Sequence, residues 1–120
     1  MAADNVKGHL DSLLLAVLED GPLHGYAVIE ALQRRSAGEL DLPTGTVYPA
    51  LRRLENAGWL RGSWSTVGGR RRRTYTLTSA GRRALSDRRS EWMRFSGTIQ
   101  RVLGGSGRAQ SAIGRPATSG

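Results

Sequence analysis

Hydrophobic residues near the start of the chain recur with the spacing of one face of a helix. Apolar positions at i, i+3, i+4, i+7 and i+8 predict an amphipathic helix over about residues 7–19, ended by Gly21-Pro22. The residues of this stripe are Leu10, Leu13, Leu14, Val17 and Leu18.

Two further helices are predicted before residue 58. The second spans about residues 24–36, and residues 36–43 form a connection rich in helix breakers. The third spans about residues 44–57, with Thr44 as its expected N-cap. The inward-facing apolar residues are Val28, Ile29 and Leu32 on the second helix, and Val47, Ala50, Leu51 and Leu54 on the third.

The position of Pro49 is compatible with two alternative starts of the third helix. If the helix begins near Thr46, Pro49 lies in the first turn and removes no hydrogen bond. If it begins at Thr44, the carbonyl of Gly45 loses its partner. At the other end, Gly58 suits a left-handed position that closes the helix in a Schellman motif, with the next residue, Trp59, packing back on the helix.

Residues 59–77 have the pattern of a β-hairpin. The run 59–67 is rich in tryptophan, threonine and valine, Gly68-Gly69 marks the turn, and 73–77 is the returning strand. Alternation places Tyr75 and Leu77 on one face of that strand. The tip is then expected to hold four arginines, Arg70, Arg71, Arg72 and Arg73.

A last helix is predicted from Thr78, as its cap, to about Leu103. Its apolar residues follow a heptad seam that is interrupted at one position by Arg88. The tail 104–120 is rich in glycine and serine and is expected to be disordered. The seam consists of Leu85, Trp92, Phe95, Ile99 and Val102.

The order helix, helix, helix, hairpin, helix predicts a mainly α fold with a small β-hairpin, a winged helix-turn-helix followed by a C-terminal dimerisation helix. We expect a DNA-binding domain over residues 1–78, with the hairpin as its wing at about 59–77. The dimerisation helix follows at 79–103, and the tail at 104–120.

Charge is distributed unevenly along the chain. The net charge is +8. Residues 1–58 hold five basic and eight acidic side chains (−3), whereas residues 59–120 hold thirteen basic and two acidic ones (+11). Basic charge gathered in one region is typical of a protein with a polyanionic partner, with a solvated surface as the alternative. Charge and the predicted winged helix-turn-helix together lead us to expect double-stranded DNA as the partner.

The composition and motifs of the chain argue against several classes of protein. Without cysteine there is no disulfide framework and no thiolate zinc site. No apolar run approaches the length of a membrane span and no secretion signal is evident, so a cytoplasmic protein is expected. No nucleophile or phosphate-loop motif is present, and we predict neither an enzyme nor a cofactor. His9 and His24 are interpreted as structural residues, and no metal site is predicted.

Residues of the third helix that lie off its apolar stripe are candidates for reading DNA. Hydroxyls suit phosphate, and guanidiniums suit phosphate or guanine. The Arg70–Arg73 run is expected to contact DNA from the wing, and the alternative is a solvated turn. Tyr48 is expected to face DNA, and the alternative is a position in the core. The candidates on the third helix are Thr44, Thr46, Tyr48, Pro49, Arg52 and Arg53.

The sequence resembles the PadR family of bacterial transcription regulators over about residues 7–103, and specifically its short subfamily with one helix after the wing. The matching segments are Lys7-Gly8-His9-Leu10, Gly21-Pro22-Leu23-His24-Gly25-Tyr26, Gly45 to Glu55 around Tyr48-Pro49, Ala57-Gly58-Trp59-Leu60, and Arg72 to Gly81.

The resemblance implies a repressor that dimerises through its last helix with help from the first. We therefore expect Leu10 and Leu14 to join the seam residues Leu85, Trp92, Phe95, Ile99 and Val102 in a homodimer interface. In multidrug-responsive relatives an aromatic residue of the last helix stacks on planar drugs, so Trp92 and Phe95 are candidate ligand contacts. The alternative is that Trp92 serves the dimer seam and binds nothing.

Two other functions are compatible with the same sequence features. The chain could be a winged-helix nucleic-acid-binding module without a small-molecule effector. It could also be a protein-interaction module whose basic wing meets an acidic partner.

Overall fold

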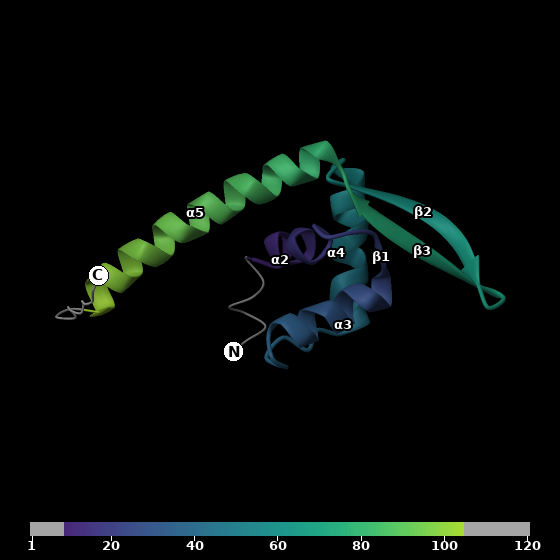
Figure 1. Cartoon of the computed structure of the whole chain (residues 1–120), viewed down its shortest axis with the longest axis horizontal. Coiled ribbons are helices and arrows are strands. Elements are labelled where there is room, and N and C mark those ends of the chain that lie inside the picture. The colour runs from purple at the N-terminus through teal and green to yellow at the C-terminus, as the bar shows by residue number, and fades with distance from the viewer. Residues whose placement is uncertain (1–8, 105–120) are drawn as a thin grey trace. The chain divides into compact units, whose positions relative to one another are not determined.

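The computed structural model describes residues 9–104, which form a mainly α fold with a small antiparallel sheet (Figure 1). The chain divides into two compact units, one extending to Ser86 and the other beginning at Asp87. The elements are α2 (Leu10–Val17), β1 (Leu23–His24), α3 (Gly25–Arg35), α4 (Thr44–Asn56), β2 (Leu60–Val67), β3 (Arg70–Leu77) and α5 (Ser79–Gly104). The predicted fold class is confirmed.

The core of the first unit lies where α2, α3 and α4 meet the base of the sheet. The predicted stripe of α4 is buried at all four positions, from Val47 to Leu54. Leu14 is 0% exposed, Leu85 3% and Leu10 8%. Packing within the chain already removes these three leucines from solvent, which favours a core role over the dimer contact that was predicted for them.

Both ends of α4 are settled by backbone geometry. The helix begins at Thr44, so Pro43, with an extended backbone, takes the N-cap position that was predicted for Thr44. Pro49 therefore lies inside the helix, where it cannot donate to the carbonyl of Gly45. At the far end Gly58 has φ +83°, and Trp59 N–H donates to the Leu54 carbonyl at 3.0 Å, as the predicted Schellman motif requires.

The sheet has the strand order β1-β3-β2. β1 was missed by the sequence pattern, and it pairs Leu23 with Tyr75. β3 begins at Arg70 and not at residue 73, so the arginine run is part of a strand and pairs with 64–67 across the hairpin. The prediction that all four arginines occupy the tip was wrong, because the turn consists of Gly68 and Gly69, both with positive φ.

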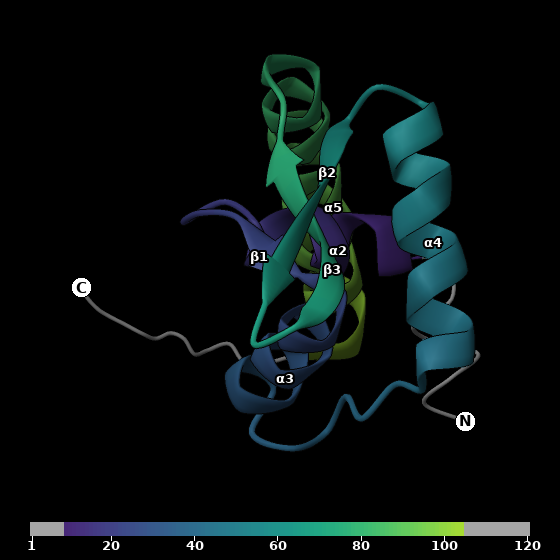
Figure 2. The same ribbon diagram turned by 90° about the vertical axis from the view of Figure 1, so that its right-hand side faces the viewer.

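The hairpin β2–β3, called the wing below, projects beyond the helices of its unit (Figure 1) and runs beside α4 (Figure 2). Its base is fixed by buried Leu60, Tyr75 and Leu77, whereas β2 is exposed from Ser63 onward. The wing is therefore a ribbon anchored at one end.

Helix α5 begins with the predicted cap, since Thr78 Oγ1 accepts from Gly81 N–H at 3.0 Å. Gly81 allows close approach: a Cβ there would lie 2.1 Å from the carbonyl oxygen of Trp59. The helix extends to Gly104, one residue beyond the expected end. The predicted disordered tail 104–120 lies outside the described residues, apart from Gly104, and so do the first residues of the first predicted helix.

Candidate nucleic-acid interface

The face of α4 away from the core is exposed throughout, as predicted. All six candidate side chains on this helix lie at its surface: Thr44, Thr46, Tyr48, Pro49, Arg52 and Arg53. Tyr48 is 39% exposed, so its interpretation as a core residue does not hold. This face offers three hydroxyls and two guanidiniums within about three helical turns.

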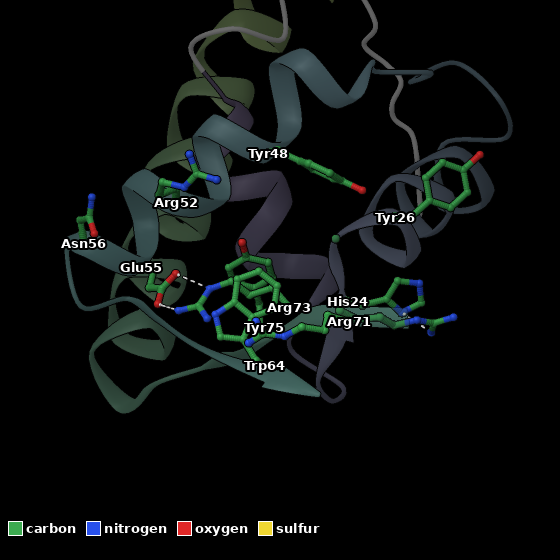
Figure 3. A pocket seen from close by; sticks show the side chains of 12 residues that line it. His24, Tyr26, Tyr48, Arg52, Glu55, Asn56, Trp64, Arg71, Arg73 and Tyr75 are labelled. Atoms are coloured by element: carbon green, nitrogen blue, oxygen red, sulfur yellow. Dashed lines mark hydrogen bonds and ion pairs between the residues drawn. The ribbon is translucent and has the colours of Figure 1, made fainter. Parts of the chain in front are cut away.

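Tyr48 and Arg52 lie one turn apart on α4 and border the same hollow, whereas Arg53 does not (Figure 3). Arg53 forms an ion pair with Asp11 of α2. Its guanidinium is therefore engaged in joining two helices, although the Arg53 side chain remains 58% exposed.

The four arginines that open β3 have different surroundings. Arg70 is exposed beside the turn. The guanidinium carbon of Arg71 lies 4.6 Å from the centre of the Trp64 ring, a cation–π distance. Arg72 Nη1 lies 3.4 Å from His24 Nδ1 at the start of α3.

Arg73 is directed inward and away from solvent. It forms an ion pair with Glu55 of α4, and Arg73 Nε donates to Glu55 Oε1 at 3.3 Å (Figure 3). Its guanidinium carbon is also 5.1 Å from the Trp64 ring centre. Of the four arginines, Arg73 is thus the one whose charge is neutralised within the chain.

A hollow of about 560 Å³ lies between α4, the start of α3 and the wing. Glu55 is its one acidic lining residue, against four arginines, so the lining is positive overall. Aromatic rings and polar groups form the remainder of the lining. The lining residues are His24, Gly25, Tyr26, Tyr48, Arg52, Glu55, Asn56, Trp64, Arg71, Arg72, Arg73 and Tyr75.

Two pKa shifts follow from these contacts. The hydrogen bond that Arg73 donates to the Glu55 carboxylate raises the pKa of Arg73 above its ordinary value, so the guanidinium stays charged. Burial, followed by the nearby Glu55 carboxylate, raises the pKa of Tyr75 above its ordinary value. The Tyr75 phenol is therefore neutral at physiological pH.

Several lining residues were absent from the predicted set, notably Tyr26, Glu55 and Trp64. Tyr26 and Trp64 are more than half exposed, which is unusual for large aromatic side chains. Trp64 was already expected in a strand, and alternation from buried Leu60 would have placed it on the inward face. Nothing in the sequence pairs Glu55 with a residue eighteen positions away.

The second unit presents an apolar stripe on α5. Trp92, Phe95, Ile99 and Val102 are 50%, 56%, 38% and 75% exposed in the single chain. The rings of Trp92 and Phe95 are 6.0 Å apart between centroids and inclined at 47°. These four residues of the predicted seam are therefore uncovered, unlike Leu10, Leu14 and Leu85.

Comparison with known proteins places this geometry in a family. Residues 14–87 match the family model of the transcriptional regulator PadR-like family. The match extends from α2 through the wing into α5 and covers more than half of the chain. The chain belongs to the PadR-like family. This PadR-like protein is accordingly a transcriptional regulator and not an enzyme, and the resemblance seen in the sequence is confirmed at the level of the family.

Individual relatives support the assignment. The regulator is 39% identical over 87 residues to the transcriptional regulator Rv3488 of Mycobacterium tuberculosis, covering 72% of this chain and 75% of that protein. It is similar to a PadR family transcriptional regulator from Eggerthella lenta, with a TM-score of 0.76, 29% identity, and coverage of 86% and 88% of the two chains.

One similar structure was solved with nucleic acid present. The Bacillus subtilis PadR in complex with operator DNA has a TM-score of 0.60 and 25% identity to this regulator. The likeness covers 65% of this chain and 45% of that one. Within residues 9–104, no helix of this PadR-like regulator is long and apolar enough to cross a membrane.

Proposed function

We propose that this PadR-like regulator binds double-stranded DNA with α4 in the major groove and the wing on the adjacent backbone. One observation supports the proposal above others. Tyr48 and Arg52 of α4 border the same positive hollow as three of the four arginines that open β3, so a polyanion can touch both elements at once.

The dimensions of DNA fit the two elements. A major groove is about 12 Å wide and admits one α-helix. In this arrangement Thr44, Thr46 and Tyr48 supply hydroxyls to phosphates, and Arg52 reaches a phosphate or a guanine edge. Arg70, Arg71 and Arg72 contact the flanking backbone. The operator complex of the Bacillus subtilis relative supports DNA as the partner.

The functional form is a homodimer. Trp92, Phe95, Ile99 and Val102 form an exposed apolar stripe that a second copy of α5 would cover. A two-fold dimer places two copies of α4 about 34 Å apart, one turn of DNA, so the operator is an inverted repeat. Occupation of such a site near a promoter represses transcription in the cytoplasm.

The same stripe favours a planar aromatic effector. Trp92 and Phe95 are neighbouring and half exposed, so a flat molecule can stack between two copies of them at the dimer interface. Binding there changes the spacing of the two α4 helices and releases DNA. Quenching of Trp92 emission by a panel of planar aromatic cations, with Trp59 and Trp64 replaced by phenylalanine, tests this step, and unchanged emission removes this effector class.

Selection from random DNA tests the main proposal. The full chain, immobilised, should enrich inverted repeats from a pool of random duplexes of about 30 base pairs. The enriched duplex should bind more tightly than a scrambled one, with affinity falling steeply as salt rises. Arg52→Ala and Tyr48→Phe should weaken binding without changing the melting temperature. Equal binding of enriched and scrambled duplexes by the wild-type chain would contradict the proposal.

A further inference from the structure

The wing has little to hold it beyond its base. Outward from Tyr75, no described residue of β2 or β3 is buried. A two-stranded ribbon of this kind is marginally stable alone and free to bend. Its tip therefore needs a link to the body if it is to meet DNA at a fixed distance from α4.

Two side-chain contacts join β3 to the body: Arg72 Nη1 lies 3.4 Å from His24 Nδ1, and Arg73 forms an ion pair with Glu55. Of these two, the ion pair of Arg73 and Glu55 links the wing to α4 itself. The two side chains are 27% and 22% exposed, so the pair is partly shielded from water and less screened than a surface pair. The guanidinium donates from two nitrogens, which fixes its orientation as well as its distance.

The residues next to Arg73 leave space for its guanidinium and contact it. A Cβ at residue 62 would lie 2.7 Å from the Nε and Nη2 atoms of Arg73, so Gly62 is what lets the guanidinium cross the hairpin. The Trp64 ring stands beside the same guanidinium and also beside Arg71. The ion pair is thus built into the packing of the wing and connects it to the last turns of α4.

We infer that Arg73 and Glu55 are positioning residues whose ion pair sets the angle between the wing and α4, so that both meet DNA together. This inference rests on the proposed DNA-binding function. Arg73 then contributes no phosphate contact, and the arginines of β3 divide into one that aligns the wing and others that touch the backbone.

Replacing Glu55 separates alignment from charge. Glu55→Ala removes a negative charge from the positive hollow, and charge alone predicts tighter DNA binding. Loss of alignment predicts the reverse: affinity for the enriched duplex falls about two- to five-fold, the scale of one partly exposed ion pair. Hydroxyl-radical protection of the flanking backbone should weaken, while protection of the major-groove bases from dimethyl sulfate by α4 is retained.

A matched control has the same change of charge away from the wing. Asp11→Ala breaks the ion pair between α2 and α4, and it should bind DNA as tightly as the wild type or more tightly. The exchanged pair Glu55→Arg with Arg73→Glu should recover part of the affinity and the flanking protection. Melting temperatures identify any variant that loses its fold. If Glu55→Ala does, DNA binding by the exchanged pair is compared with that of the wild type instead.

The outcomes distinguish failure of the proposed DNA-binding function from failure of the positioning role alone. If the wild type prefers no duplex, the proposed function fails and this inference fails with it. If the wild type is selective but Glu55→Ala binds as tightly as Asp11→Ala and keeps the flanking protection, the positioning role alone is overturned.

Discussion

The ring of Tyr48 on α4 lies against the backbone of Gly25 at the start of α3. A Cβ added at residue 25 would be 2.8 Å from Tyr48 Cε1. Gly25 has no positive φ that would exclude a side chain. The clash involves the far part of a mobile side chain, so the ring can move away while the helices stay in place.

Gly25→Ala should therefore displace the Tyr48 hydroxyl without unfolding the protein. Affinity for the enriched duplex should fall by about 0.5–1.5 kcal/mol, the net value of one hydrogen bond. The melting temperature should stay level or rise, since alanine favours helices. The pair Gly25→Ala and Tyr48→Ala, measured in a double-mutant cycle, should show strong non-additivity. Additive effects would show that residue 25 acts elsewhere.

The exposed wing arginines should act through phosphate contacts. Arg71→Ala and Arg72→Ala should each lower the slope of log K against log salt by about 0.9. Arg73→Ala should weaken binding with a smaller change of slope, because Glu55 already neutralises it. Arg61→Ala is the control, an exposed arginine at the base of the wing outside the hollow. Salt titrations by fluorescence anisotropy measure the slope for all four variants. If every slope equals that of the wild type, the wing is a solvated ribbon that makes no phosphate contact.

The approach of α5 to Trp59 should make Gly81 critical for stability. In Gly81→Ala the new Cβ meets a backbone carbonyl at 2.1 Å, which cannot swing away. We expect destabilisation of about 1–3 kcal/mol or more. Gly97→Ala in the same helix meets nothing closer than 3.8 Å and should stabilise by about 0.5–1 kcal/mol. Chemical denaturation compares them, and equal stabilities would contradict the close approach.

The stripe on α5 should control assembly. Ile99→Asp with Val102→Asp should give monomers, because burying a charge in an apolar interface is costly. Gln100→Asp, an exposed substitution outside the predicted seam, should leave the oligomeric state unchanged. Sedimentation velocity at micromolar concentration reads out both variants. A monomeric wild type would contradict the dimer and the effector site that depends on it.

Periodicity predicted the parts of this fold that local pattern controls. The four buried positions of α4 follow from a 3.6-residue repeat, and the Schellman end follows from one glycine. Two-residue β1 has no period to detect. The four arginines that open β3 lack the alternation of a half-buried strand, so the hairpin was predicted too short.

The candidate residues lie on the elements in which the sequence placed them, but the sequence did not show their contacts. Exposure of Tyr48 and Arg52 follows from helical phase, but the partners of Arg53 and Arg73 come from other elements. Leu14 and Leu85 fit an apolar stripe equally well as core or as interface, and burial within one chain assigned them to the core. Such choices depend on tertiary packing, which one sequence does not display.

Amide chemical shifts of the isotope-labelled full chain, recorded as the enriched duplex is added, test the central claim most directly. We predict that the largest changes fall on residues 44–53 of α4 and 63–72 of the wing, with Tyr48 and Arg71 among them. Gln33 and Glu39, which lie outside the hollow, should change little. Perturbations confined to α2 and α3, with α4 and the wing unmoved, would contradict the account.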